Sequence, residues 1–137
     1  PDILDNAFVI IEYEHGARAM LDLCMFAEAS RNEQEISVVG HLGKVEALVS
    51  EGIVRIGRRS AGYGNVGTEP VADPDIRHIG MHHGASYLEH VALRDAILSE
   101  SEPAVTLRDG LASVAVGVAA HRSIEEGRFV KLDEVLG

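Results

Sequence analysis

Residues 7–27 read AFVIIEYEHGARAMLDLCMFA, two apolar arms separated by Glu14-His15-Gly16. The first arm contains a β-branched and aromatic run, Phe8 to Ile11, of the kind that favours strands. Glycine readily takes the positive φ of a tight turn, so the chain is predicted to reverse at Gly16. The second arm, residues 17–27, has apolar side chains at both alternating sets of positions. The stretch therefore predicts a β-hairpin with apolar surface on both faces.

Further strands are predicted beyond this hairpin. Turn-forming sets, Gly40-His41-Leu42-Gly43 and Ser50-Glu51-Gly52, separate three short apolar stretches at residues 35–39, 44–49 and 53–57. This pattern predicts an antiparallel meander. Residues 60–84 contain five of the fourteen glycines and two of the four prolines, so they are predicted to be irregular, with an edge strand near residues 69–72.

Two helices are predicted in the remainder of the chain. Ser86 and Glu89 have the spacing of a capping box, which predicts a helix that begins at Ser86 and runs to about Ser99. Thr106 and Asp109 form a similar box before a longer helix, rich in alanine, that ends at Gly127.

A last strand at residues 129–132 is predicted to rejoin the sheet. The fold class predicted is α+β, a largely antiparallel sheet with both helices packed on one face. The two-sided apolar strands leave the other face in need of cover, so we expect a homo-oligomer. The alternatives are a face covered by another domain of the same protein, or a face that stays partly exposed to solvent.

Composition excludes several classes of function. The 137 residues suit one domain, and no apolar run is long enough for a membrane helix. A net charge of −10 with scattered basic residues argues against nucleic acid. Cys24 cannot form an internal disulfide and no signal peptide is recognisable, so a cytoplasmic location is expected. Cys24 itself is interpreted as a small core residue rather than a nucleophile.

Two motifs suggest a ligand. Gly62-Tyr63-Gly64-Asn65-Val66-Gly67 has the G-x-G-x-x-G spacing of a dinucleotide loop, but Pro70 and Pro74 follow where that motif requires a helix. We therefore predict that it holds no dinucleotide. His82, His83 and His90 with Glu89 invite a metal interpretation, yet neither H-E-x-x-H nor H-x-x-E-H is present.

A second interpretation of His82 and His83 is hydrogen bonding to a polyhydroxylated ligand, because imidazole both donates and accepts and these residues precede a helix. A structural or surface role is the alternative. Tyr87 is placed to present its phenol toward the same region, or to serve as a half-buried packing residue.

Read in order, these pieces resemble the C-terminal domain of the glucose-fructose oxidoreductase, inositol dehydrogenase and MocA family. The resemblance spans about residues 7–132. It is carried by the hairpin quoted above and by EISVVGHLGKVEA (35–47), HHGASYLEHVALRDAI (82–97) and DGLASVAVGVAAHRSIEEGRFVKL (109–132), of which the last is the most specific.

The resemblance implies that residues 1–137 are a single C-terminal domain, preceded in the family by a dinucleotide-binding domain that is absent from this sequence. It implies hydride transfer between a sugar, cyclitol or related polyol and NAD or NADP, with the cofactor held outside this stretch. No catalytic, cofactor-binding or metal-binding residue is then expected here. His83 is implied to contact substrate, with His82 and Tyr87 beside it, and a homodimer or homotetramer is expected to form through the sheet face.

The start at Pro1, with a strand-like run already present by Phe8, is interpreted as the cut edge of a longer protein; a trimmed but complete protein is the alternative. The isolated stretch is expected to be inactive. Two rival hypotheses are a free-standing, non-catalytic module that binds a polyol or associates with itself, and a small metal enzyme using His82 and His83.

Overall fold

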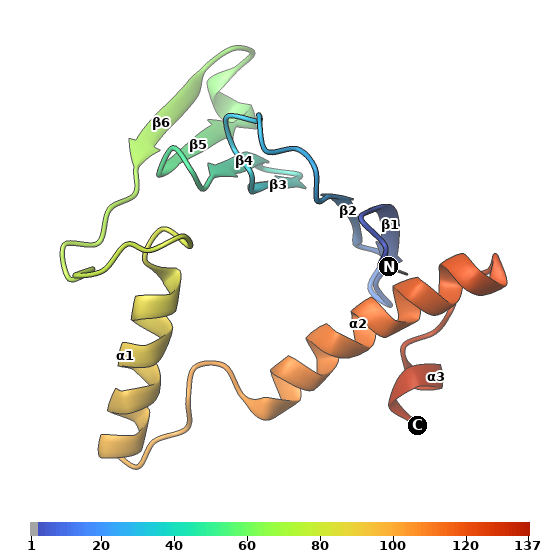
Figure 1. Ribbon diagram of the computed structural model, residues 1–137. Coiled ribbons are helices and arrows are strands. Elements are labelled where there is room, and N and C mark those ends of the chain that lie inside the picture. The colour runs from blue at the N-terminus through green and yellow to red at the C-terminus, as the bar shows by residue number, and fades with distance from the viewer. Residues whose placement is uncertain (1–2) are drawn as a thin grey trace. The chain divides into compact units, whose positions relative to one another are not determined.

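The computed structural model describes residues 3–137 (Figure 1). Its elements are β1 (Asn6–Glu12), β2 (Arg18–Cys24), β3 (Glu35–Gly40), β4 (Gly43–Leu48), β5 (Ile53–Arg58), a short 3-10 turn (Arg59–Ala61), β6 (Val66–Pro70), α1 (Ala85–Leu98), α2 (Leu107–Glu126) and α3 (Asp133–Leu136). Strands come first and helices follow, so the predicted α+β class is confirmed.

Internal contacts divide the chain into two compact units. The first contains the residues up to Phe8 and Asp22–Leu88, and the second contains Val9–Leu21 and Glu89–Gly137. The packing of both helices on one sheet face, within a single domain, stays a prediction.

A four-stranded antiparallel sheet, in the order β3-β4-β5-β6, is the main element of the first unit (cyan to green in Figure 1). The strands predicted at residues 35–39, 44–49 and 53–57 are confirmed as β3, β4 and β5. The edge strand lies earlier than residues 69–72, because Val66 pairs with Gly57 and Pro70 pairs with Ile53, so that β6 spans the length of β5. Proline is tolerated there because it ends an edge strand.

The two faces of this sheet differ in chemistry. Successive side chains alternate between faces, so the cross-strand pairs Val38–Val45 and Val45–Ile56 place three apolar residues in one row. The neighbouring row on the opposite face, through Ser37, Glu46 and their partners, is polar. One face is therefore apolar and the other is mixed.

The predicted hairpin of β1 and β2 is confirmed and forms its own two-stranded sheet. Its turn is closed by the Tyr13 amide, which donates to the Ala17 carbonyl at 3.0 Å. The last cross-strand bond runs from the Met25 amide to the Asp5 carbonyl at 2.8 Å, and β2 ends at Cys24 because β1 offers no further partner. Cys24 is exposed, which corrects its interpretation as a core residue.

α1 begins at Ala85, one residue before the position predicted for its cap. Ser86 therefore lies inside the helix, and the predicted capping box of Ser86 and Glu89 is wrong. The Leu88 amide donates to the Gly84 carbonyl at 3.1 Å, so the helical bonding pattern already starts at Gly84. The helix ends at Leu98, and beyond it the Ser101 amide donates back to the Ala96 carbonyl at 3.0 Å.

The second capping box is confirmed. The Asp109 amide donates to the Thr106 hydroxyl at 3.2 Å, and the Thr106 amide donates to the Asp109 carboxylate at 2.8 Å. These bonds lower the pKa of Asp109, the side-chain bond from Thr106 being the largest cause. α2 ends at Glu126, with Gly127 in the left-handed conformation, as predicted.

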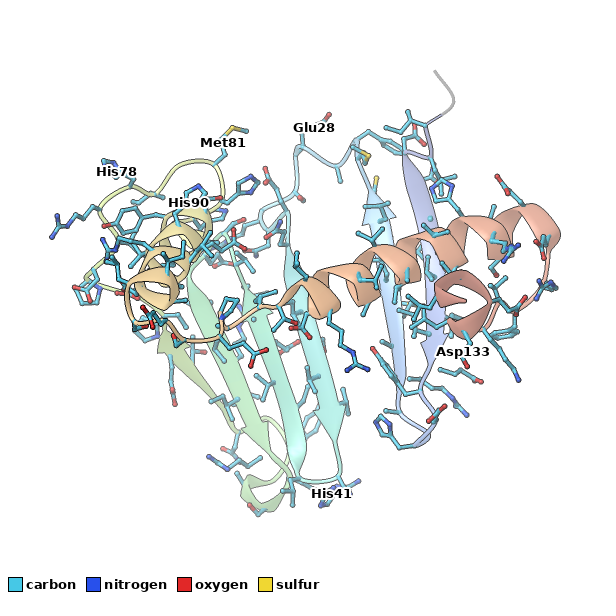
Figure 2. The ribbon with its side chains drawn as sticks, turned by 90° about the horizontal axis from the view of Figure 1, so that it is seen from below. Glu28, His41, His78, Met81, His90 and Asp133 are labelled. Carbon is cyan, nitrogen blue, oxygen red and sulfur yellow. The ribbon has the colours of Figure 1, made fainter. Side chains whose placement is uncertain are left out.

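The predicted strand at residues 129–132 is wrong, because side chains occupy the backbone groups that a sheet would use. Ser123 donates to the Arg128 carbonyl at 2.6 Å, and the Lys131 amide donates to the Glu134 carboxylate at 2.9 Å. Arg128 joins Glu126 at 2.6 Å and Glu134 at 2.8 Å. This network directs the chain into α3, which begins at Asp133 and lies against α2 (Figure 2).

Burial is sparse within the described residues. Leu48 in β4 and Ala115 in α2 are the two buried hydrophobic residues, at 7 % and 3 % exposure. None of the helices in residues 3–137 has the length and apolar character needed to cross a membrane.

The Arg128 network predicts a pH-dependent contribution to stability. Hydrogen bonds from Arg128 and from the Lys131 amide lower the pKa of Glu134 from 4.5 to about 2. A carboxylate with a lowered pKa stabilises the fold above its unfolded value and loses this effect as the pH falls from 4.5 toward 2. Glu134→Gln should therefore be less stable than the wild type at neutral pH, and the difference in denaturant midpoint should shrink across that window.

Glu125→Gln is the matched control, since Glu125 lies in the same helix region outside the network. Its midpoint should follow the wild type at every pH. A difference for Glu134→Gln that stays constant down to pH 2 would contradict the assignment of this network.

Candidate functional site

The predicted site residues lie on the connection between β6 and α1 and on the first turn of α1. Figure 2 shows His78 and Met81 on this connection, just ahead of α1. His82 and His83 are exposed, and Tyr87 is half-buried. All three belong to the first compact unit, so one local structure positions them.

A tight turn sets the direction in which the two histidines leave the backbone. The Gly84 amide donates to the Ile79 carbonyl at 2.6 Å, and the Ala85 amide donates to the His82 carbonyl at 2.9 Å. His83 lies between these bonds with a φ of +52°, in the left-handed region. Non-glycine residues in this region are uncommon, and such strain clusters at functional sites. The strain at His83 makes it the most notable of the three predicted residues.

Gly84 fits this turn because no other residue has room there. Its φ is +90°, and a Cβ added to it would lie 2.7 Å from side-chain carbons of Ile76. Ile76 is half-buried and Gly84 is buried, so the two close the inner side of the connection. This packing holds the His82-His83 turn directly against the start of α1.

Tyr87 packs against a residue that the sequence did not single out. The ring of His78 lies 5.6 Å from that of Tyr87, at an interplanar angle of 66°, an edge-to-face arrangement. His78 therefore restricts the orientation of the phenol ring. They are nine positions apart in the sequence, a spacing that follows no helical or strand period, so only the turn brings them together.

The predicted site residues do not form one connected cluster. Within residues 3–137, the side chains of His82, His83 and Tyr87 share no hydrogen bond. His90 lies farther along α1 (Figure 2). The described part of the chain contains no group of three or more His, Cys, Asp or Glu side chains able to hold a metal ion. The arrangement suits a surface that donates and accepts single hydrogen bonds, as hydroxyl groups require.

The glycine loop does not meet the requirements of a dinucleotide. Gly62–Asn65 connects the 3-10 turn at Arg59–Ala61 to β6, and Val66 and Gly67 are the first residues of that strand, which runs antiparallel to β5. A pyrophosphate is bound by a helix N-terminus that follows such a loop in a parallel βαβ unit. A strand follows here instead, so the loop does not fit a nicotinamide cofactor.

The family of this chain follows from its match to a family model. Residues 2–132 match the model of the oxidoreductase family, C-terminal alpha/beta domain, which comprises the glucose-fructose oxidoreductase, inositol dehydrogenase and MocA proteins. The chain belongs to this family, as the resemblance implied.

A relative supports the same assignment. The chain is 31 % identical over 139 aligned positions to a myo-inositol 2-dehydrogenase of Thermotoga maritima. The match covers 98 % of this chain but 38 % of that enzyme. The chain is thus an oxidoreductase C-terminal domain, similar to part of an inositol dehydrogenase.

The close fit of Gly84 gives a test of the turn. Gly84→Ala introduces both an unfavourable φ and a clash with Ile76, whereas Gly80→Ala introduces only the unfavourable φ, since nothing lies within 4 Å of its Cβ position. A left-handed non-glycine residue costs roughly 1–2 kcal/mol. We expect Gly80→Ala to lose about that much stability and Gly84→Ala clearly more, measured by denaturant unfolding. Equal losses would show that Ile76 does not pack on Gly84.

Proposed function

We propose that this chain is the substrate-side domain of an NAD- or NADP-dependent oxidoreductase that acts on a sugar, a cyclitol or a related polyol. The observation that supports this most is the family match over residues 2–132, together with the relative named for oxidation of myo-inositol. The proposal concerns the intact enzyme, because this chain spans 38 % of that relative's length.

The nicotinamide cofactor would be held by sequence outside this chain, since the loop at Gly62–Gly67 does not fit it. When bound, NAD or NADP accepts or supplies the hydride. The role of the present residues is to bind and orient the polyol. We expect the isolated chain to carry out no hydride transfer.

His83 is the proposed principal contact, with His82 and Tyr87 beside it. Imidazole and phenol groups accept from one hydroxyl and donate to another, so they can recognise a polyhydroxylated ring. The packing of His78 on Tyr87 restricts the phenol ring before substrate arrives, and the left-handed φ of His83 sets the direction in which its side chain leaves the backbone. Such preorganisation lowers the entropy lost on binding.

His83→Gly in the intact enzyme separates a binding role from a structural one. Glycine accepts the positive φ at no steric cost, so stability should be unchanged or improved. The lost hydrogen bond should raise KM for myo-inositol by roughly tenfold, as expected for about 1.4 kcal/mol. Steady-state assays with NAD and with NADP measure this effect.

His15→Gly is the control, because His15 lies in the β1–β2 turn, outside the proposed pocket wall. It should leave KM unchanged. A normal KM for His83→Gly would remove His83 from the substrate site. Polyol binding by the intact protein without nicotinamide-dependent turnover would instead support a non-catalytic binding module.

We also propose that the intact enzyme associates through the apolar face of the four-stranded sheet, with a second copy as the partner. Ile36 and Val38 are 59 % and 60 % exposed on this face, and Val45 is 41 % exposed. Exposed apolar rows of this kind mark interaction surfaces. A homodimer or homotetramer would cover them.

Val38→Lys places a charge on this face, and Ser37→Lys places the same charge on the opposite face of the same strand. Light scattering during gel filtration should show a smaller species for Val38→Lys than for Ser37→Lys or the wild type. The same mass for all three proteins would exclude this face as the interface between copies.

A further inference from the structure

A hollow of about 280 Å³ lies at the end of the four-stranded sheet where β4 follows β3. Figure 2 marks this end by His41, in the turn between the two strands. The lining comes from the ends of β3, β4 and β5, from Arg59, and from the glycine loop that leads into β6. All of it belongs to the first compact unit.

The sheet register explains why this space is open. Val39, Lys44, Gly57 and Val66 pair in sequence across the four strands and so form one row on one face. Gly57 contributes no side chain to the row. A Cβ added there would meet Val66 Cγ2 at 3.6 Å, an ordinary contact distance. The floor of the hollow is therefore bare backbone between Lys44 and Val66.

The lining is positive in a protein that is strongly negative. Lys44, Arg58 and Arg59 line the hollow and no acidic residue does, whereas the whole chain has 22 acidic and 12 basic residues. Within residues 3–137, neither arginine forms a salt bridge. Arg59 Nη1 donates to the His41 carbonyl at 3.4 Å, which leaves further guanidinium donors for a ligand.

The loop over the hollow is held in one shape. Gly62 and Gly64 have φ values of +82° and +80°. The Asn65 side chain donates to the Ala61 carbonyl at 2.6 Å, and the Asn65 amide donates to the Gly62 carbonyl at 3.4 Å.

We propose that this hollow is a binding site for a small phosphate-bearing ligand, held by Arg59 and Lys44 beside the Gly62–Asn65 loop. Arg58 also borders the hollow, but it follows Gly57 in β5, so its side chain starts from the opposite face of the sheet. A phosphate dianion matches the guanidinium donors of arginine and the point charge of lysine. The volume lies at the lower limit of ligand pockets, so a small phosphate monoester fits and a dinucleotide does not. The site is independent of the proposed polyol contacts.

Glu46 is the nearest acidic competitor. Its carboxylate accepts from Lys44 Nζ at 2.8 Å, on the same face of β4. A bound phosphate would compete with Glu46 for the lysine. Removal of that carboxylate in Glu46→Gln should therefore increase the affinity for phosphate.

Titration of the intact protein with inorganic phosphate in a calorimeter tests the site directly. We expect saturable binding that is at least tenfold weaker in Arg59→Glu, since a guanidinium partner becomes a repulsive charge. Arg108→Glu is the control, because it changes the net charge equally from the start of α2, outside the lining. Gly57→Val keeps every charge and fills the floor, so it should also weaken binding.

The same titration with glycerol 3-phosphate and with acetate shows which chemical group of a ligand the site recognises. Equal affinity for glycerol 3-phosphate and inorganic phosphate would show that the site recognises the phosphate group alone, and tighter binding of the ester would identify a phosphorylated metabolite. Tighter binding of acetate than of phosphate overturns the proposal. So does equal affinity in Arg59→Glu and Arg108→Glu, or no saturation by phosphate up to about 10 mM.

Discussion

The antiparallel hydrogen-bond ladder from β3 to β6 is the constraint on which the first unit depends. Its backbone bonds pair β3 with β4, β4 with β5 and β5 with β6, and Leu48 is the buried hydrophobic residue of these strands. The ladder also fixes the register, and the register decides which residues share a face. An apolar row and a mixed face follow from it, as does the gap that Gly57 leaves at one end of the sheet.

Elsewhere, side chains that bond to the backbone decide where elements begin and end. Thr106 and Asp109 start α2, and the network of Ser123, Arg128 and Glu134 takes the backbone groups that a further strand would need. The turn at His82-His83 is closed by backbone bonds alone and admits only glycine at position 84. These local constraints place the proposed substrate contacts at the start of α1.

Two surfaces of different chemistry therefore lie within the first unit. The proposed polyol contacts present neutral donors and acceptors on a strained turn, whereas the hollow at the sheet end presents positive charge under a glycine loop. The family match concerns the domain as a whole and assigns neither surface. The glycine loop had the spacing of a nucleotide motif, but β6 follows it, and its curvature instead covers a small hollow.

Much of this protein was predictable from its sequence, because hydrophobic period, turn residues and capping pairs act over a few neighbouring positions. The strands at residues 35–58, the Thr106 cap, the end of α2 and the family all followed from such local patterns. The start of α1, the absence of a strand at residues 129–132 and the packing of His78 on Tyr87 did not. The first two were decided by bonds between residues only a few positions apart, which a sequence pattern does not rank against a strand or a cap. The contact of His78 with Tyr87 and the grouping of residues on one sheet face were decided by the tertiary structure, because their partners meet only after the chain folds.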